Sequence, residues 1–163
     1  MVPRPLLYAG VAVALLAGCR TVGPPATSAP GRATAQSLLQ KFEPGVTWKT
    51  GTLLEADFDG DSVKDYALGG IKEGDRYVVG IVRGPLGDSA RHWTLEFGAD
   101  EGDQESLCSL QAAMSLENLD ESVIEESGGK LQGSKGINLH DDRCDAFHIH
   151  WSPKDQRFEW WRL

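Results

Sequence analysis

The sequence lacks an excess of positive charge, a membrane-length apolar segment and the short motifs of common catalytic sites. Its 163 residues hold 24 acidic side chains against 16 Lys and Arg, so the formal net charge is −8. Such a surface repels nucleic acid and anionic lipid, and the sequence therefore predicts no nucleic-acid partner. No G-x-S-x-G, P-loop or Cys–His arrangement is present, which excludes the enzyme classes that depend on those motifs.

The longest apolar run, Leu6 to Ala17, is too short for a permanent transmembrane helix but fits the core of a signal peptide. Arg4 precedes the run, which ends in LAGC. The segment resembles the leader of bacterial lipoproteins, whose lipobox ends in the acylated cysteine. The resemblance implies a signal peptide over residues 1–18, cleavage before Cys19, and acyl groups such as palmitate on its thiol and amine. An ordinary secretory leader or an interfacial helix is the alternative.

Residues 19–35 are mainly Pro, Gly, Ala, Ser and Thr. Such a segment buries too little apolar surface to offset the entropy of ordering, so it predicts a flexible linker from the lipid to one domain over residues 36–163. Arg20 follows the cysteine, whereas in Gram-negative lipoproteins an Asp there signals inner-membrane retention. The resemblance therefore favours the outer membrane, facing the periplasm. Removing residues 1–18 takes away one Arg and no acid, and the charge moves from −8 to −9, so acyl groups rather than charge would hold the protein at the membrane.

Only three cysteines occur, Cys19, Cys108 and Cys144. With Cys19 assigned to lipid, an even pair remains, and in an exported chain such a pair usually forms a disulfide. Two buried free thiols are the alternative. The sequence thus predicts a bond between Cys108 and Cys144.

Apolar periodicity predicts a mainly β domain, an antiparallel meander or small sheet with a short N-terminal helix; an α+β fold is the alternative. Helical spacing covers residues 34–43 and ends at Pro44 and Gly45. Alternating or β-branched runs predict strands joined by short turns. They cover residues 46–58, 65–72, 76–84, 91–98, 144–151 and 157–163. Residues 107–127 are ambiguous between a helix and a strand, because Leu107, Leu110 and Met114 have helical spacing that residues 123–127 do not extend.

Polar and aromatic side chains near the C-terminus offer weaker signals. His148 and His150 fall on one face of a predicted strand, as a zinc pair or, alternatively, as part of an exposed polar face. Trp160 and Trp161 point to opposite faces of the last strand, so one of them could stack on a sugar or anchor a partner protein. A sheet covered on both faces is the alternative.

The stretch DFDGDSVKD holds four aspartates in nine residues, Asp57, Asp59, Asp61 and Asp65. Calcium binds about six to eight oxygens on a loop that curls around it, and alternating carboxylates can supply them. Carboxylates this close repel one another and resist ionisation without a cation. An ordered loop of this spacing therefore indicates a bound divalent ion, with a solvated Asp/Gly-rich turn as the alternative.

The loop is not an EF-hand, because Leu68 stands at the position where that motif has its bidentate Glu. Instead DFDGDSVKD followed by YALGG resembles the calcium loop of FG-GAP/VCBS repeats, which joins two antiparallel strands. The resemblance implies a structural Ca²⁺ held by Asp57, Asp59, Asp61, the Val63 carbonyl and Asp65. Ser62 stands where the family usually has Gly, and it would be strained if that position needs positive φ. The loop occurs once, which excludes a β-propeller, and the whole chain resembles small bacterial lipoproteins of unknown function that hold a single such loop.

Together these features predict a lipid-anchored cell-envelope protein whose calcium-braced β domain has a binding or structural role rather than a catalytic one. Its partner would be a protein or a glycan of the envelope. The alternative is a periplasmic inhibitor of a lysozyme-like enzyme, because an acidic surface suits a basic enzyme; this rests on analogy. A glycan hydrolase would need two carboxylates facing each other across one cleft.

Overall fold

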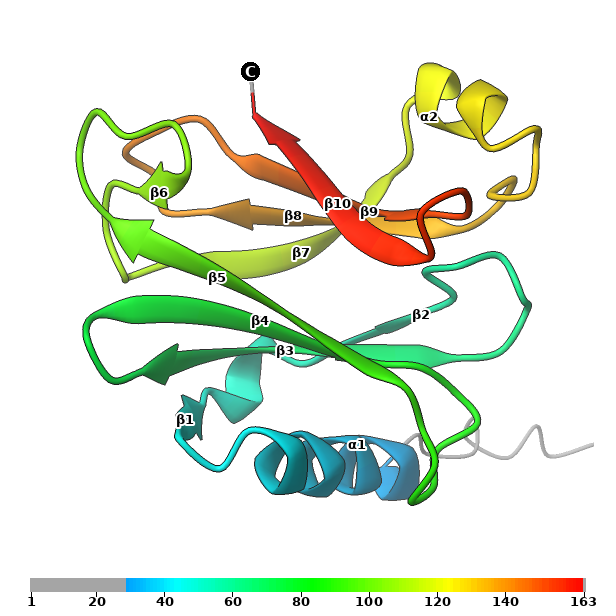
Figure 1. Ribbon diagram of the computed structural model, residues 1–163, viewed down its shortest axis with the longest axis horizontal. Helices are drawn as coiled ribbons and strands as arrows, with labels where there is room; N and C mark the ends of the chain where they lie inside the picture. Colours follow the sequence, from blue (N-terminus) through cyan, green and yellow to red (C-terminus); the bar gives the residue numbers. More distant parts are fainter. Residues whose placement is uncertain (1–28, 163) are drawn as a thin grey trace, which may run out of the picture.

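The computed structural model describes residues 29–162 as two β-sheets packed face to face, with a helix on the outer face of the first sheet (Figure 1). The elements are α1 Ala29–Phe42, β1 Val46–Trp48, the 3-10 helix η1 Thr50–Thr52, β2 Leu54–Ala56, β3 Asp65–Lys72, β4 Arg76–Val82, β5 His92–Ala99, β6 Ser106–Leu107, β7 Ala113–Asn118, α2 Glu121–Glu126, β8 Lys135–His140, β9 Phe147–Ser152 and β10 Arg157–Arg162. The mainly β prediction is confirmed.

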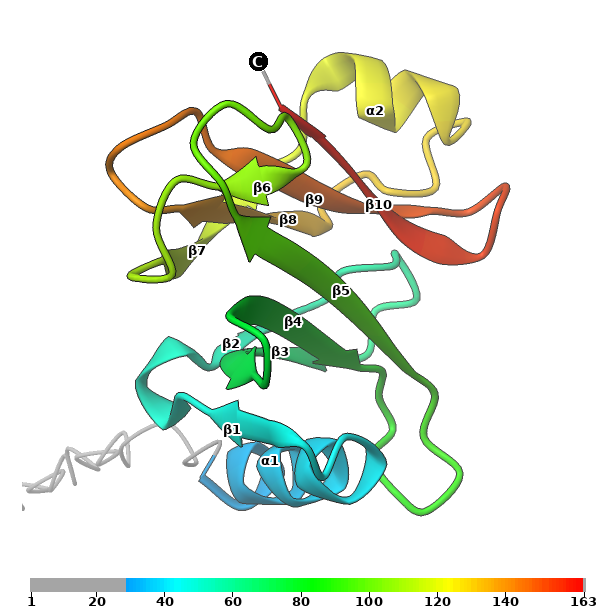
Figure 2. The ribbon, with the colours of Figure 1, turned by 60° about the vertical axis from the view of Figure 1, so that its left-hand side comes forward.

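The first sheet has the order β1-β3-β4-β5-β6, with β2 also paired to β3, and the second has the order β10-β9-β8-β7. All pairs are antiparallel except β5 with β6, so the meander is interrupted there. Figure 2 shows the layers from the side, with α1 beneath the first sheet and α2 beyond the second. Residues 107–127 contain part of β6, then β7 and α2. The helical spacing of Leu107, Leu110 and Met114 therefore falls on strands and their connection, and the helix lies beyond it.

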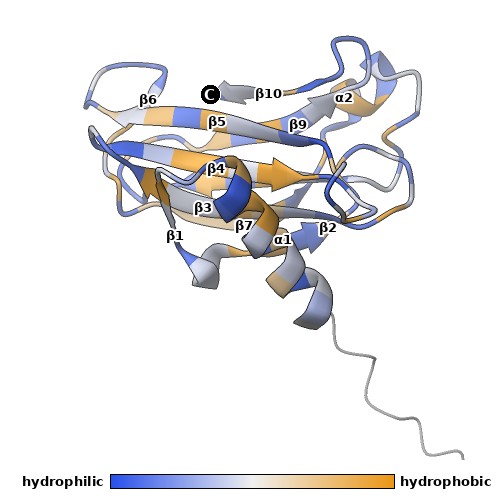
Figure 3. Cartoon of the chain, turned by 60° about the horizontal axis from the view of Figure 1, so that its bottom comes forward, coloured by the Kyte–Doolittle hydropathy of each residue, from blue (hydrophilic) through white to orange (hydrophobic). Residues whose placement is uncertain are grey.

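Strand β4 lies between two apolar layers, and its side chains alternate between them. Tyr77, Val79 and Ile81 pack in the core between the two sheets. Val78 and Val82 pack instead against α1. A strand buried on both faces needs a nearly continuous apolar run, which this one has (Figure 3).

Helix α1 begins at Ala29, so the prediction of a flexible linker up to residue 35 is wrong for residues 29–35. The linker was predicted because this segment has few large apolar side chains, but here small side chains pack against the sheet. Ala35 is fully buried beside Leu39, and a Cβ at Gly31 would lie 2.3 Å from the Tyr66 hydroxyl. Small residues thus let the helix lie close to the sheet, and its tertiary contacts stabilise it.

The predicted signal peptide, the predicted lipidation site Cys19 and the remaining linker residues 19–28 lie outside the described residues. Between residues 29 and 162, no helix is both long and apolar enough to cross a membrane.

The predicted disulfide between Cys108 and Cys144 is confirmed. It joins the connection between β6 and β7 to the connection between β8 and β9. Figure 1 shows these two connections at one end of the sandwich and the β2–β3 loop at the other. The aspartate loop and the disulfide are therefore well separated.

Candidate metal centre

The aspartate loop joins β2 to β3, two antiparallel strands in which Ala56 pairs with Asp65. Asp57, Asp59 and Asp61 each offer one carboxylate oxygen, and these oxygens all lie within 4.8 Å of one another. Two ligands on opposite sides of a calcium ion are about 5 Å apart, twice the metal–oxygen distance. The cluster could therefore hold a metal ion. The Asp59 side chain is only 1% exposed, unlike an ordinary solvated surface acid.

Backbone amides curl the loop around these carboxylates. Asp57 accepts hydrogen bonds from the amides of Gly60 at 2.7 Å, Ser62 at 2.9 Å and Asp59 at 3.2 Å. Asp61 Oδ1 accepts one from the Val63 amide at 2.8 Å. These donors offset part of the repulsion between the carboxylates. The prediction from the sequence had assigned this role to a bound cation alone. Each of the three carboxylates still has lone pairs for a metal, because even Asp57 accepts three hydrogen bonds where a carboxylate has about four lone-pair sites.

Arg83, the residue after β4, is a site residue that the sequence analysis missed. Its Nη2 lies 3.0 Å from Asp61 Oδ2, and its Nε contacts Asp59 Oδ2. The guanidinium also lies over the indole of Trp151, 5.4 Å from the ring centroid. The site thus has a positive charge from the protein itself.

Burial is the main influence on the ionisation of Asp59. Desolvation raises the pKa of this carboxyl, and the nearby Arg83 guanidinium lowers it in part. Asp61 and Asp57 raise the pKa further because they carry like charge. The net direction is upward, so a second cation would favour the ionised form of Asp59.

Asp65 is placed differently from the other three predicted carboxylate ligands. It is fully buried at the start of β3, and it is not part of the converging group. Its Oδ2 accepts from the Phe58 amide at 2.9 Å and its Oδ1 from the Gly84 amide at 3.0 Å. Asp65 therefore ties the beginning of the loop to the segment after β4.

Ser62 has φ +66°, in the left-handed region, so the condition under which a serine is strained at this position is met. A non-glycine residue there costs about 1–2 kcal/mol, and glycine gives back part of that through its greater freedom when unfolded. We expect Ser62→Gly to raise the free energy of unfolding by about 0.5–1 kcal/mol, measured by urea denaturation. Ser62→Ala keeps the strain and should leave the stability nearly unchanged. A glycine variant less stable than the alanine variant would contradict this interpretation.

The histidine pair does not form a metal site with its neighbours in this structure. Among residues 29–162, the three aspartates are the one group of at least three acidic, His or Cys side chains whose ligand atoms converge. His148 Nδ1 lies 2.8 Å from Glu117 Oε2, and its ring stacks on Trp161 at 5.0 Å. Trp161 thus lies on the outer face, whereas Trp160 packs on the core, so these two side chains point to opposite faces as predicted.

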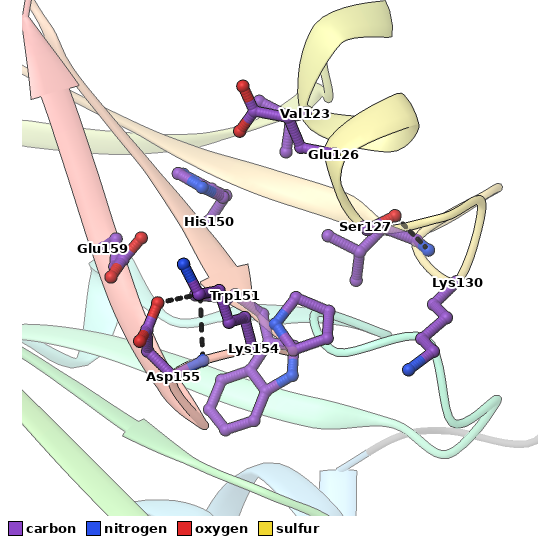
Figure 4. Close-up of a pocket in the computed structure, with 12 residues that line it drawn as sticks. Val123, Glu126, Ser127, Lys130, His150, Trp151, Lys154, Asp155 and Glu159 are labelled. Carbon is purple, nitrogen blue, oxygen red and sulfur yellow. Dashed lines mark hydrogen bonds between the residues drawn. The ribbon is translucent and has the colours of Figure 1, made fainter.

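A cavity of about 350 Å³ lies between α2 and the β9–β10 hairpin (Figure 4). Glu126 from α2, His150 from β9 and Glu159 from β10 line it together with Lys130. Burial lowers the pKa of His150, so its imidazole is neutral at pH 7. Trp151 and Lys130 also border the hollow beside Asp59 and Asp61. The cavity and the aspartate loop are therefore neighbours.

No protein-family model, curated protein or solved structure matches the chain. The resemblance to lipoproteins with one FG-GAP/VCBS-like loop therefore stays a prediction.

Proposed function

We propose that this protein is a lipid-anchored component of the bacterial cell envelope whose β domain is braced by a structural calcium ion and a disulfide. The observation that carries the metal part is the convergence of Asp57, Asp59 and Asp61 on a loop between two strands. The anchor rests on the lipoprotein-like leader that ends at Cys19. The proposed role is binding or structural, in the outer membrane facing the periplasm.

Calcium suits this donor set better than the other common metals. The site offers carboxylate oxygens and no nitrogen or sulfur ligand from the described side chains, which disfavours zinc. Magnesium demands near-ideal octahedral geometry and usually keeps several waters, whereas calcium accepts the irregular geometry of a turning loop. The ion would neutralise the repulsion between the carboxylates.

Each of the five predicted ligand residues has its own part in this proposal. Asp57, Asp59 and Asp61 would bind the ion through their carboxylates, and the Val63 carbonyl remains the predicted fourth donor. Asp65 would hold the loop in position through its hydrogen bonds, since both of its oxygens already accept from backbone amides. The loop is then a brace for the sandwich rather than a catalytic centre.

Adding calcium to the chelated protein is expected to raise its melting temperature. A ligand that binds only the folded state at 100 times its Kd stabilises it by about 2.7 kcal/mol. Calorimetric titration and thermal unfolding of the full-length protein in detergent provide the two readouts. Asp57→Asn should lose most of the gain, whereas Asp88→Asn, whose side chain is 92% exposed, should keep it. Absence of both heat and a melting shift at millimolar calcium would reject the metal site.

A further inference from the structure

The carboxylates of the aspartate loop already have a cation in contact with them. Arg83 reaches Asp61 at 3.0 Å and contacts Asp59, and its own side chain is only 20% exposed. Asp59 is almost completely buried and Asp61 is partly exposed. An ion pair with a partner this buried is weakly screened by solvent and salt. Arg83 therefore interacts directly with the loop carboxylates and is not a solvated surface charge.

We propose that Arg83 is an internal cation that competes with the metal ion for Asp59 and Asp61 and so sets the affinity of the loop for calcium. This inference rests on the calcium site proposed above. A guanidinium and a divalent ion held by the same two carboxylates would repel each other strongly over a few ångströms. Binding of the ion therefore requires Arg83 to move away from at least one of them.

The structure offers the displaced guanidinium a place to go. It already lies over the Trp151 ring, and the hollow beside it is lined further by Pro153 and Gln156. An arginine that leaves a carboxylate can keep its stacking contact with the indole face. A change of side-chain rotamer would achieve this movement and leave the hydrogen bond from the Arg83 amide to the Arg91 carbonyl in place.

Competition has two consequences of opposite sign. In the metal-free protein Arg83 lowers the repulsion between Asp59 and Asp61 and stabilises the loop. In the metal-bound protein the same contact has been lost, so its free energy is subtracted from the binding of the ion. Removing Arg83 should therefore weaken the metal-free fold and tighten metal binding. If the role of Arg83 were merely structural, its removal would have to weaken both the metal-free fold and the binding of the metal.

The decisive variant is Arg83→Met in the full-length protein, with Arg91→Met as the matched control. Arg91 lies over Trp93 at 5.2 Å, a similar cation–π contact, and unlike Arg83 it forms no ion pair with an aspartate of the described residues. Calorimetric titration with CaCl₂ should give a Kd about tenfold lower for Arg83→Met, which corresponds to 1.4 kcal/mol. Urea denaturation in chelator should show a lower midpoint for the same variant. The Arg91→Met control should neither lower the Kd for calcium tenfold nor lower the urea midpoint in the same way.

The outcomes separate the inference from the calcium site on which it rests. If Arg83→Met binds calcium as weakly as the wild type, or more weakly, the competition is rejected while the calcium site stands. If neither protein binds, both proposals fail. If only the variant binds, Arg83 competes strongly enough to exclude the ion, which supports the inference and rejects a calcium brace in the native chain.

A second measurement needs no variant and covers the case in which Arg83→Met fails to fold. Phenylglyoxal modifies accessible arginines, and peptide mapping can follow Arg83 alone. Its modification rate in the wild-type protein should rise several-fold when calcium is added to the chelated sample. An unchanged rate in a protein that binds calcium would overturn the competition.

Discussion

Breaking the bond between Cys108 and Cys144 is expected to lower the free energy of unfolding by about 4 kcal/mol. The two cysteines are 36 residues apart, and closing a loop of this length in the unfolded chain removes an entropy worth roughly that amount. Domains of this size are stable by only about 5–15 kcal/mol. The disulfide would therefore account for a large part of the total.

Local contacts on both sides of the bond suit this bracing role. Asp141 accepts hydrogen bonds from the Ser109 amide at 2.7 Å and from the Cys144 amide at 3.1 Å. Arg143 donates to the Cys108 carbonyl at 3.2 Å. The two connections therefore meet through these hydrogen bonds as well as through the covalent bond, so its loss should not distort the native fold.

Urea denaturation of the Cys108→Ala/Cys144→Ala variant, with and without a reductant, tests this expectation. The reductant should shift the wild-type midpoint down to that of the variant and leave the variant itself unchanged. A loss below about 1 kcal/mol would show that the unfolded chain is constrained by something other than this loop.

Asp65→Ala is expected to cost about 2–5 kcal/mol, because it leaves one buried and one partly buried backbone donor without a partner. Those donors are the amides of Phe58 and Gly84. Asp59 also links the loop to the segment after β4, but through the Arg83 side chain and not through a backbone amide. Denaturation in chelator measures the loss free of metal effects, and Asp88→Ala, with its exposed side chain, should stay within about 0.5 kcal/mol of wild type.

Asp65 also gives the metal-free protein a dependence on pH. Burial raises the pKa of this carboxyl to about 7, although the two amide donors oppose the shift. The folded state therefore holds a proton more tightly than the unfolded state, whose Asp65 titrates near 4. Its contribution to stability is complete below pH 4 and is lost as the pH rises to about 7. The stability of chelated wild type relative to Asp65→Asn should fall over that window, and a difference that stays flat or rises would contradict the shift.

Period-two alternation in β9 was sufficient to predict its two faces. Ile149 and Trp151 are buried in the core, and His148 and His150 lie on the other face. Such a pattern is local, because each side chain is placed by its neighbours along one strand. The aspartate loop could be recognised for the same reason, since its ligands lie within a few residues of one another.

The partners of that loop could not be predicted, because they depend on which strands pair and in which register. Tyr66 pairs with Val82 across β3 and β4, and this register is what brings Arg83 and Gly84 beside the aspartates. Hydrophobic pattern alone fixes which face a strand buries, not the residue opposite it on another strand. The two-residue strand β6 and the six-residue helix α2 are similarly too short for periodicity to separate them.

The positions of the aspartate loop and the disulfide have a consequence for how the domain resists proteases. Folded proteins open locally where their stability is lowest, and a protease can cleave the backbone that is exposed there. Here the disulfide ties one end of the sandwich, and the ion proposed for the aspartate loop would tie the other end (Figure 1). Cleavage at either end would require release of that end's tie, and the two ties respond to different conditions, divalent-ion supply and redox state. A domain closed in this way would suit the extracytoplasmic location proposed above.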